Sequence, residues 1–287
     1  MNARLFRPRR SFLFVPGSNL ALFPKAVHSR ADIVCVDLED AVAPDDKARA
    51  RENTVKMLDQ SPSFGQSEVL VRVNSLRSRD GMADVLALLE CTAPPDGLML
   101  PKVKHPEEIR ALDDLLTAEG SDLRLQVIIE TNPGLECCHE IARASCRVDS
   151  LLFGGVDMAA ELRVEPTWEG LHYARMRCVH AAAAAEIDMI DVPYLDLDNL
   201  DGLAKEAALC AQIGMTGKGA IHPKQLPVIV KAFTPSADQI AHARKIVQAF
   251  ESAGTGLIVV DNKLIEKPVL RSMYRILSLV ETMDIDG

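Results

Sequence analysis

Short apolar runs alternate with longer amphipathic segments along most of this 287-residue chain. Each apolar run is rich in aliphatic residues and stops at a polar or turn-forming residue, which is typical of strands buried on both faces. We expect eight such strands, at residues 11–15, 31–38, 68–73, 97–100, 125–131, 148–153, 187–192 and 214–221.

The segments between these strands show helical spacing. In residues 106–119, for example, Ile109, Leu112 and Leu116 recur every three or four positions between acidic residues. We expect helices at residues 44–57, 80–89, 106–119, 135–144, 171–185 and 200–213.

Strands that alternate with helices favour an α/β protein with a parallel sheet, and eight units favour the (β/α)8 TIM barrel. A doubly wound sheet is the alternative. It would carry the glycines of GxGxxG after the first strand, whereas Pro16-Gly17-Ser18 stands there.

The last part of the chain is longer than a final barrel helix requires. Residues 236–252 and 268–282 are expected helices, with an extended segment at 256–261 between them. We therefore expect a barrel over residues 1–225 and a C-terminal helical extension over 226–287, which packs on a neighbour or covers a site.

Composition narrows the class of protein. The net charge of −9 and pI of about 5.3 disfavour nucleic-acid binding. No run is long enough to span a membrane, and the basic N-terminus lacks the apolar stretch of a signal peptide, so a cytoplasmic enzyme is expected. The seven cysteines show no CxxC spacing, and we interpret them as reduced core residues.

Charged residues stand at the ends of nearly all the expected strands. In chain order they are Asp37, Glu39, Arg72, Lys102, Glu130, Asp157, Asp191 and Lys218, with His222 just beyond the last strand. Barrel enzymes build their sites at the carboxyl ends of the strands, so this pattern predicts an active site there. His222 is interpreted as a residue that positions a loop.

Two of these residues suggest a metal. Glu130 and Asp157 end successive strands, and two hard oxygen donors suit Mg²⁺, whereas zinc would prefer His or Cys. Arg72 either neutralises Asp37 and Glu39 or grips a substrate carboxylate. Four close carboxylates need compensation, which one Arg and one divalent cation would supply. The pattern thus indicates a metal-assisted reaction on an anionic, oxygen-rich substrate.

Several longer motifs carry a resemblance to a known family. They are RSFLFVPGSN (10–19), DIVCVDLEDAV (32–42), VLVRVN (69–74), GLMLPKV (97–103), IIET (128–131), LLFGGVDMA (151–159), GKGAIHPKQ (217–225) and KLIEKPV (263–269). With these motifs the chain resembles the HpcH/HpaI aldolase and citrate lyase β-subunit family, in its CitE-like acyl-CoA lyase branch. The resemblance covers nearly the whole chain.

The resemblance implies a TIM barrel whose C-terminal extension covers a neighbour's active site in a homotrimer or homohexamer. It implies that Glu130 and Asp157 bind Mg²⁺ and that Arg72 holds an acyl oxygen or carboxylate. Asp37 and Glu39 would orient Arg72 and metal-bound waters. The residues expected to line the path of CoA are Phe14, Pro16, Lys25, Lys102, Lys218 and His222.

The implied reaction is a retro-Claisen cleavage of a β-hydroxyacyl-CoA such as malyl-CoA or citramalyl-CoA. Relatives often carry an acid–base Asp in an IDxP pattern of the tail, and here Glu266 stands in its place. Three alternatives remain open at this stage. They are a thioesterase acting at the same site, a CoA-independent pyruvate aldolase, and a citrate lyase β-subunit acting on a citryl thioester.

Overall fold

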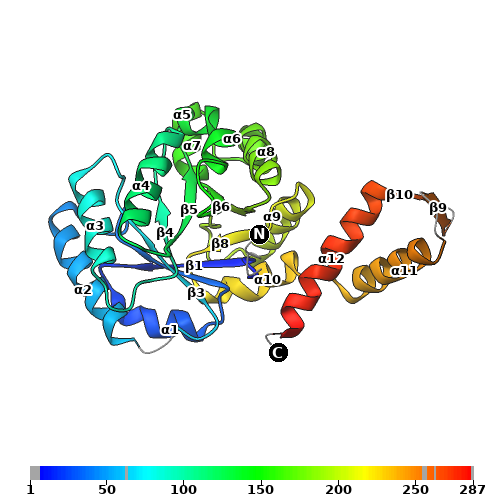
Figure 1. Ribbon diagram of the computed structural model, residues 1–287, viewed down its shortest axis with the longest axis horizontal. Helices are drawn as coiled ribbons and strands as arrows, with labels where there is room; N and C mark the ends of the chain where they lie inside the picture. The colour runs from blue at the N-terminus through cyan, green and yellow to red at the C-terminus, as the bar shows by residue number, and fades with distance from the viewer. Residues whose placement is uncertain (1–6, 62–63, 254–256, 262, 286–287) are drawn as a thin grey trace. The chain divides into compact units, whose positions relative to one another are not determined.

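Eight parallel strands close into a barrel in which β8 pairs with β1 (Figure 1). The computed structural model describes residues 7–61, 64–253, 257–261 and 263–285. The barrel strands are β1 (Ser11–Pro16), β2 (Ile33–Asp37), β3 (Glu68–Arg72), β4 (Gly97–Leu100), β5 (Arg124–Ile129), β6 (Val148–Phe153), β7 (Asp188–Asp191) and β8 (Gly217–Ala220). The predicted (β/α)8 barrel is therefore confirmed.

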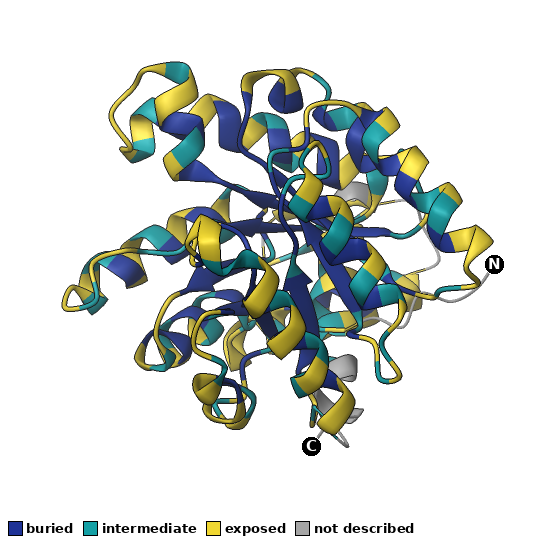
Figure 2. Ribbon diagram, turned by 90° about the vertical axis from the view of Figure 1, so that its left-hand side faces the viewer, coloured by how far each residue is buried: buried dark blue, intermediate teal, exposed yellow. Residues whose placement is uncertain are grey.

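Helices cover the outside of the barrel and bury one face each against it (Figure 2). In α2, for example, the buried residues Ala50, Thr54 and Leu58 recur every four positions. These helices are α1 (Phe23–His28), α2 (Lys47–Gln60), α3 (Arg79–Leu89), α4 (Pro106–Ala118), α5 (Asn132–Glu136), α6 (Cys138–Ala142), α7 (Gly155–Leu162), α8 (Trp168–Ala185), α9 (Leu200–Gln212) and α10 (Leu226–Phe233).

The interior of the barrel is a packed apolar layer. It comprises Phe12, Ile33, Cys35, Leu70, Met99, Ile128, Leu152 and Ile190. Side chains alternate with a period of two along a strand, so the residue two positions further on faces the same way. Asp37, Arg72 and Glu130 follow Cys35, Leu70 and Ile128 by two positions. The same alternation that buries the core therefore turns these three charged side chains toward the barrel interior, one step nearer the carboxyl ends of the strands.

A polar cluster closes the opposite, amino-terminal end of the barrel. Arg9 donates to Glu68 at 2.7 Å and to Asp149 and Asp188 at 3.2 Å. Gln126 donates to Glu68 at 3.2 Å. Buried carboxylates require such partners, and the cluster satisfies them where the strands begin.

The observed barrel differs from the predicted one in three elements. The helix expected at 135–144 is divided into α5 and α6, because Cys137 departs from helical geometry between them. The sequence did not predict α7, so Asp157 lies in the first turn of this helix rather than at a strand end. The eighth strand is shorter than expected, since Gly214 turns the chain with a φ of 98°.

The chain divides into two compact units, of which the barrel unit spans Arg9–Val230. The second contains the chain from Lys231 onward, with α11 (Ala237–Ala253), the antiparallel hairpin β9 (Leu257–Val260) and β10 (Lys263–Glu266), and α12 (Lys267–Ile285). Both predicted tail helices are present, and β9 falls in the predicted extended segment, whose first residue, Gly256, lies outside the described residues. The hairpin partner β10 was not predicted. The domain boundary at residue 225 stays a prediction.

None of the helices in the described part of the chain has the length and apolar character that a bilayer crossing requires. All seven cysteines are free. Cys35, Cys138, Cys178 and Cys210 are buried as expected, but Cys146 is exposed, so the core assignment does not hold for all seven.

Candidate active site

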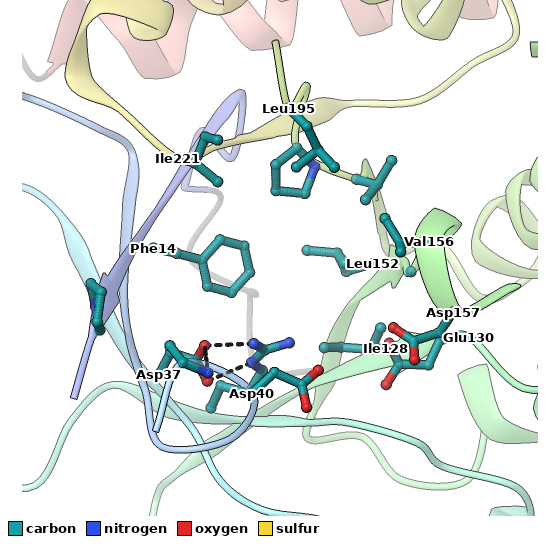
Figure 3. A pocket seen from close by; sticks show the side chains of 16 residues that line it. Phe14, Asp37, Asp40, Ile128, Glu130, Leu152, Val156, Asp157, Leu195 and Ile221 are labelled. Atoms are coloured by element: carbon teal, nitrogen blue, oxygen red, sulfur yellow. Dashed lines mark hydrogen bonds and ion pairs between the residues drawn. The ribbon is translucent and has the colours of Figure 1, made fainter. Parts of the chain in front are cut away.

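A cavity of about 380 Å³ opens at the carboxyl ends of the barrel strands (Figure 3). Charged side chains lie along one side of it, namely Asp37, Asp40, Arg72, Glu130 and Asp157. Apolar side chains line the rest, among them Phe14, Ile128, Leu152, Leu195 and Ile221. The structure therefore brings four residues of the strand-end pattern (Asp37, Arg72, Glu130 and Asp157) to one cavity, as that pattern predicted.

Arg72 is held by a bidentate contact with Asp37. The two residues are direct neighbours in the register of β2 and β3. The Arg72 Nε donates to Asp37 Oδ1 at 2.7 Å and Nη2 donates to Oδ2 at 2.5 Å. On the cavity side, the guanidinium carbon lies 5.3 Å from the centre of the Phe14 ring. These contacts fix the plane of the guanidinium.

Burial by itself lowers the pKa of Arg72, but the hydrogen bonds and charge of Asp37, with Glu39, raise it above its ordinary value. Arg72 is therefore a permanent cation in this cavity.

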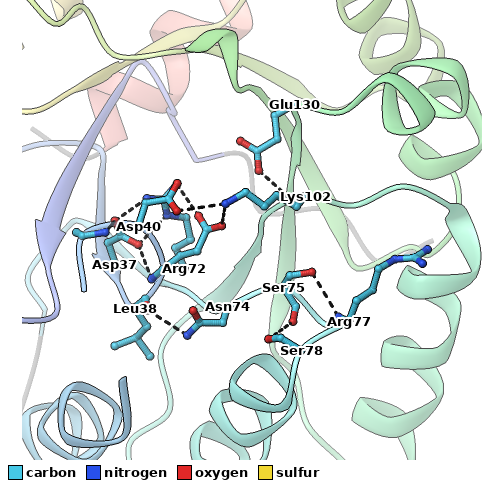
Figure 4. A network of polar contacts seen from close by, with 12 residues as sticks. Asp37, Leu38, Asp40, Arg72, Asn74, Ser75, Arg77, Ser78, Lys102 and Glu130 are labelled. Atoms are coloured by element: carbon cyan, nitrogen blue, oxygen red, sulfur yellow. Dashed lines mark hydrogen bonds and ion pairs between the residues drawn. The ribbon is translucent and has the colours of Figure 1, made fainter. Parts of the chain in front are cut away.

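A second ion network lies beside Arg72 (Figure 4). Glu39 is 5% exposed and forms an ion pair with Arg72 at 3.1 Å and another with Lys102. Lys102 also reaches Asp40 at 3.2 Å. Burial raises the pKa of Glu39, and the charges of Arg72 and Lys102 oppose that rise.

Glu130 is almost completely buried, with 3% exposure. Its Oε1 accepts a hydrogen bond of 2.7 Å from the backbone N–H of Lys102. Gly154 makes room for it, since a Cβ there would lie 2.4 Å from the Glu130 Cβ. Burial, together with the charges of Glu39 and Asp157, raises the pKa of Glu130 to about 7.

Arg72 and Lys102 are paired with Asp37 and Glu39. No ion pair formed by the described residues compensates Glu130 or Asp157, so these two carboxyl groups are open to a cation. Among the described residues, no cluster of three or more His, Cys, Asp or Glu side chains could hold a metal ion. Two carboxylates completed by water and substrate are a usual donor set for Mg²⁺, so the residues fit this ion.

Lys218, predicted on the CoA path, lies instead in a buried network. Its ammonium is fully buried and donates to Asp191 at 2.5 Å and to Val192 O and Glu206 at 2.7 Å. Asp191 also pairs with Arg175 at 2.9 Å. An ammonium has three donors, and all three are used here. This geometry does not fit a contact with CoA, because the strand register turns Lys218 toward the helices.

Among the other predicted CoA residues, Phe14 and Pro16 line the cavity, and Lys25 is exposed on α1. The ring of His222 accepts from the N–H of Lys224 at 3.0 Å and caps a short helical turn, which is the loop-positioning role suggested from sequence.

Glu266 lies in the second unit, at the end of β10. In the hairpin register it is opposite Leu257, and Leu264 is opposite Val259. All four side chains are exposed. Opposite residues of an antiparallel pair face the same side, so Glu266 is the one carboxylate on an apolar hairpin face. Its catalytic role stays a prediction.

Apart from Phe14 and Pro16, sequence reasoning did not identify the apolar side of the cavity. Val156, Leu195 and Ile221 line it although they are 53%, 60% and 40% exposed. Single apolar residues in loops carry no periodic signal, so only their position after the strand ends could have indicated them.

Comparisons with known proteins identify the family of this chain. The model of the family described as HpcH/HpaI aldolase/citrate lyase matches residues 10–223. The chain is 36% identical to an L-malyl-CoA/beta-methylmalyl-CoA lyase of Cereibacter sphaeroides, with 91% of each chain covered. It is 34% identical to citrate lyase subunit beta of Escherichia coli, covering 99% of this chain and 97% of that one.

A crystal structure of the protein CitE from Mycobacterium tuberculosis, in complex with magnesium, acetoacetate and coenzyme A, is also similar. Its TM-score is 0.78 at 28% identity, over 94% of this chain and 97% of that one. The family match covers most of the chain, and two relatives exceed 30% identity over nearly all of it. This protein belongs to the HpcH/HpaI aldolase/citrate lyase family.

Proposed function

We propose that this protein is a Mg²⁺-dependent carbon–carbon lyase. Its substrate is a β-hydroxyacyl-CoA such as malyl-CoA or citramalyl-CoA, which it cleaves reversibly into an acyl-CoA and a 2-oxo acid. The observation that carries the proposal is the arrangement of Arg72 and the Glu130–Asp157 pair on one cavity. The near full-length similarity to a malyl-CoA/beta-methylmalyl-CoA lyase supports it.

Glu130 and Asp157 would hold the Mg²⁺. When bound, this ion would polarise oxygen atoms of the substrate and make its β-hydroxyl more acidic. The buried position of Glu130 and its hydrogen bond from Lys102 keep one ligand fixed.

Arg72 would hold the thioester oxygen, which becomes negative as the enolate of the acyl-CoA forms. A guanidinium has five N–H donors, and Asp37 occupies two of them, so others can face the substrate. Donors placed at a developing oxyanion are each worth about 3–4 kcal/mol.

Proton transfers complete the reaction. A carboxylate of the site would accept the proton of the β-hydroxyl as the carbon–carbon bond breaks. Glu266 of a neighbouring copy, or a water, would then return a proton to the enolate carbon. We propose a homotrimer or homohexamer in the cytoplasm, in which each extension serves a neighbouring barrel.

The CoA moiety would enter past Phe14 and Pro16. Lys25 and His222 lie on the segments that follow β1 and β8, which are adjacent strands of the barrel. Their side chains are exposed at the same end as the cavity. Lys25 can therefore meet the anionic phosphates of CoA.

The test is incubation with malyl-CoA, β-methylmalyl-CoA, citramalyl-CoA and citryl-CoA, each with Mg²⁺, followed by mass spectrometry of the products. We expect glyoxylate or pyruvate with acetyl-CoA or propionyl-CoA. Free CoA with malate and no 2-oxo acid would contradict the lyase and identify a thioesterase. The variant Glu130→Ala should keep its fold by circular dichroism and lose Mg²⁺-dependent turnover.

A further inference from the structure

Lys102 has an unusual backbone conformation next to the site. It follows β4 with a φ of 54°, in the left-handed region that residues other than glycine rarely adopt. Such strain persists where the surroundings impose it, and it gathers at functional sites. Here the turn aims the Lys102 N–H at Glu130 Oε1, at a distance of 2.7 Å.

The side chain of Lys102 points to the other half of the site. Its ammonium pairs with the buried Glu39 and with Asp40 (Figure 4). The second oxygen of Glu39 lies 3.1 Å from Arg72. Contacts therefore run from Lys102 through Glu39 to Arg72.

We propose that Lys102 is a positioning residue that braces both halves of the active site. Its backbone fixes the carboxylate of Glu130, and its ammonium fixes Glu39 and through it Arg72. This inference rests on the proposed function, and it replaces the contact with CoA that the sequence predicted for Lys102.

The ion pair of Lys102 with Glu39 matters because Glu39 is buried beside Arg72. Without the ammonium, Arg72 alone would compensate Glu39 and would be drawn away from its bidentate contact with Asp37. A displacement of about 1 Å at a reacting group can lower the rate about 100-fold.

Four variants separate the two contacts of Lys102, namely its backbone N–H with Glu130 and its ammonium with Glu39. Lys102→Gly removes the ammonium and accepts the left-handed backbone, so the N–H to Glu130 is kept. Lys102→Val also lacks the ammonium, and its β-branched side chain opposes that backbone. Lys102→Met keeps the length of the side chain without its charge. Lys104→Met is the matched control, because Lys104 is an exposed lysine in the same loop.

Each full-length variant is assayed for kcat and KM with the CoA ester. For Lys102→Met and Lys102→Gly we expect kcat to fall about 10–100-fold while KM stays within about twofold, since the ester is still bound. Lys104→Met should match the wild type.

Binding of Mg²⁺ alone to the metal-free proteins, measured by calorimetry, tests the backbone contact of Lys102 with Glu130. Lys102→Val should bind Mg²⁺ at least about fivefold more weakly than Lys102→Gly, because it disfavours the conformation that holds Glu130.

A tenfold or larger rise in KM at unchanged kcat would identify Lys102 as a CoA contact and overturn the proposal. Wild-type kinetics in both Lys102→Met and Lys102→Gly would overturn it as well. If Lys102→Val does not fold, the kcat and KM of Lys102→Met and Lys102→Gly still test the proposal. If the wild type cleaves no CoA ester, the proposed function fails, whereas the Mg²⁺ comparison still tests the hold on Glu130.

Discussion

At the scale of single residues, Glu130 combines two opposing demands. It must be ionised to bind a cation, but burial and its acidic neighbours raise its pKa to about 7 from its ordinary value of 4.5. The folded, metal-free protein therefore binds this proton more tightly than the unfolded chain does. The contribution of this proton to the stability of the folded protein is fully present below pH 4.5 and is lost as the pH rises through about 7.

The variant Glu130→Gln should reveal how much stability the ionisation of Glu130 costs, because Gln is neutral at every pH and can still accept a hydrogen bond from the Lys102 N–H. In EDTA at pH 8 we expect it to be more stable than the wild type, by on the order of 3 kcal/mol. At pH 5 the difference should fall to about 1 kcal/mol or less. Urea unfolding at both pH values measures it, and a pH-independent difference would contradict the raised pKa.

Arg72 depends on the shape of its side chain as well as on its charge. Lys cannot form the bidentate contact with Asp37, so Arg72→Lys keeps the charge and loses the orientation. We expect kcat/KM to fall about 100–1000-fold, the usual effect of losing a donor at a developing oxyanion. Circular dichroism should show an unchanged fold. Activity within a few-fold of the wild type would mean that charge alone suffices.

At the scale of elements, the junction of β6 and α7 shapes the proposed metal site. Gly154 lies so close to Glu130 that a Cβ there would be 2.4 Å from the Glu130 Cβ and 2.5 Å from its Oε2. No rotation of a side chain removes the first overlap, so the two strands would have to move apart.

Gly154→Ala should therefore destabilise the protein by about 1–3 kcal/mol and weaken Mg²⁺ binding about tenfold or more. Gly155→Ala is the matched control, since a Cβ there would meet only side chains, at 3.1 Å or beyond. Thermal unfolding and calorimetry measure the two effects. Equal losses in both variants would show that Glu130 is not specifically displaced.

The elements that the sequence predicts best are the barrel strands, because they are buried on both faces. Apolar runs located most of them to within a few residues, although β8 (Gly217–Ala220) has glycines and Lys218 in place of such a run. The α7 helix escaped prediction because it is short and begins at Gly155, a poor helix former. The strand period also placed Asp37, Arg72 and Glu130 together.

The contacts of lysines were harder to predict than the positions of the acids. A strand-end pattern gives the location of Lys102 and Lys218 but not the direction of their long side chains. Lys218 turns outward to Asp191, and Lys102 takes a left-handed backbone that only glycine would have signalled. Tertiary packing decides both.

At the scale of the whole molecule, catalysis in the proposed assembly is divided between two copies of the chain. Arg72 belongs to the barrel unit, while Glu266 belongs to the second unit and stands on an apolar, exposed hairpin face. Exposed apolar side chains that share one hairpin face suit an interface. In the proposed assembly, a neighbouring subunit is the partner.

This division predicts complementation. Arg72→Lys and Glu266→Gln should each be nearly inactive alone, whereas subunits exchanged between them should regain activity. Random exchange would leave about a quarter of the sites with Arg72 from one subunit and Glu266 from another. The activity of the mixture after mild dissociation and reassembly measures this. Unchanged inactivity, with exchange verified by native mass spectrometry, would contradict a shared site.

The polar cluster at the base of the barrel also bears on how the chain is synthesised. Arg9 is made before the first strand, yet its partner Asp188 follows 179 residues later. The first strand, β1, likewise pairs on one edge with β8, which is synthesised last of the eight strands. Contacts so distant in sequence form late and slowly. On the ribosome, the barrel therefore closes only after all eight strands have emerged, and until then the nascent sheet has two open edges for chaperones to protect.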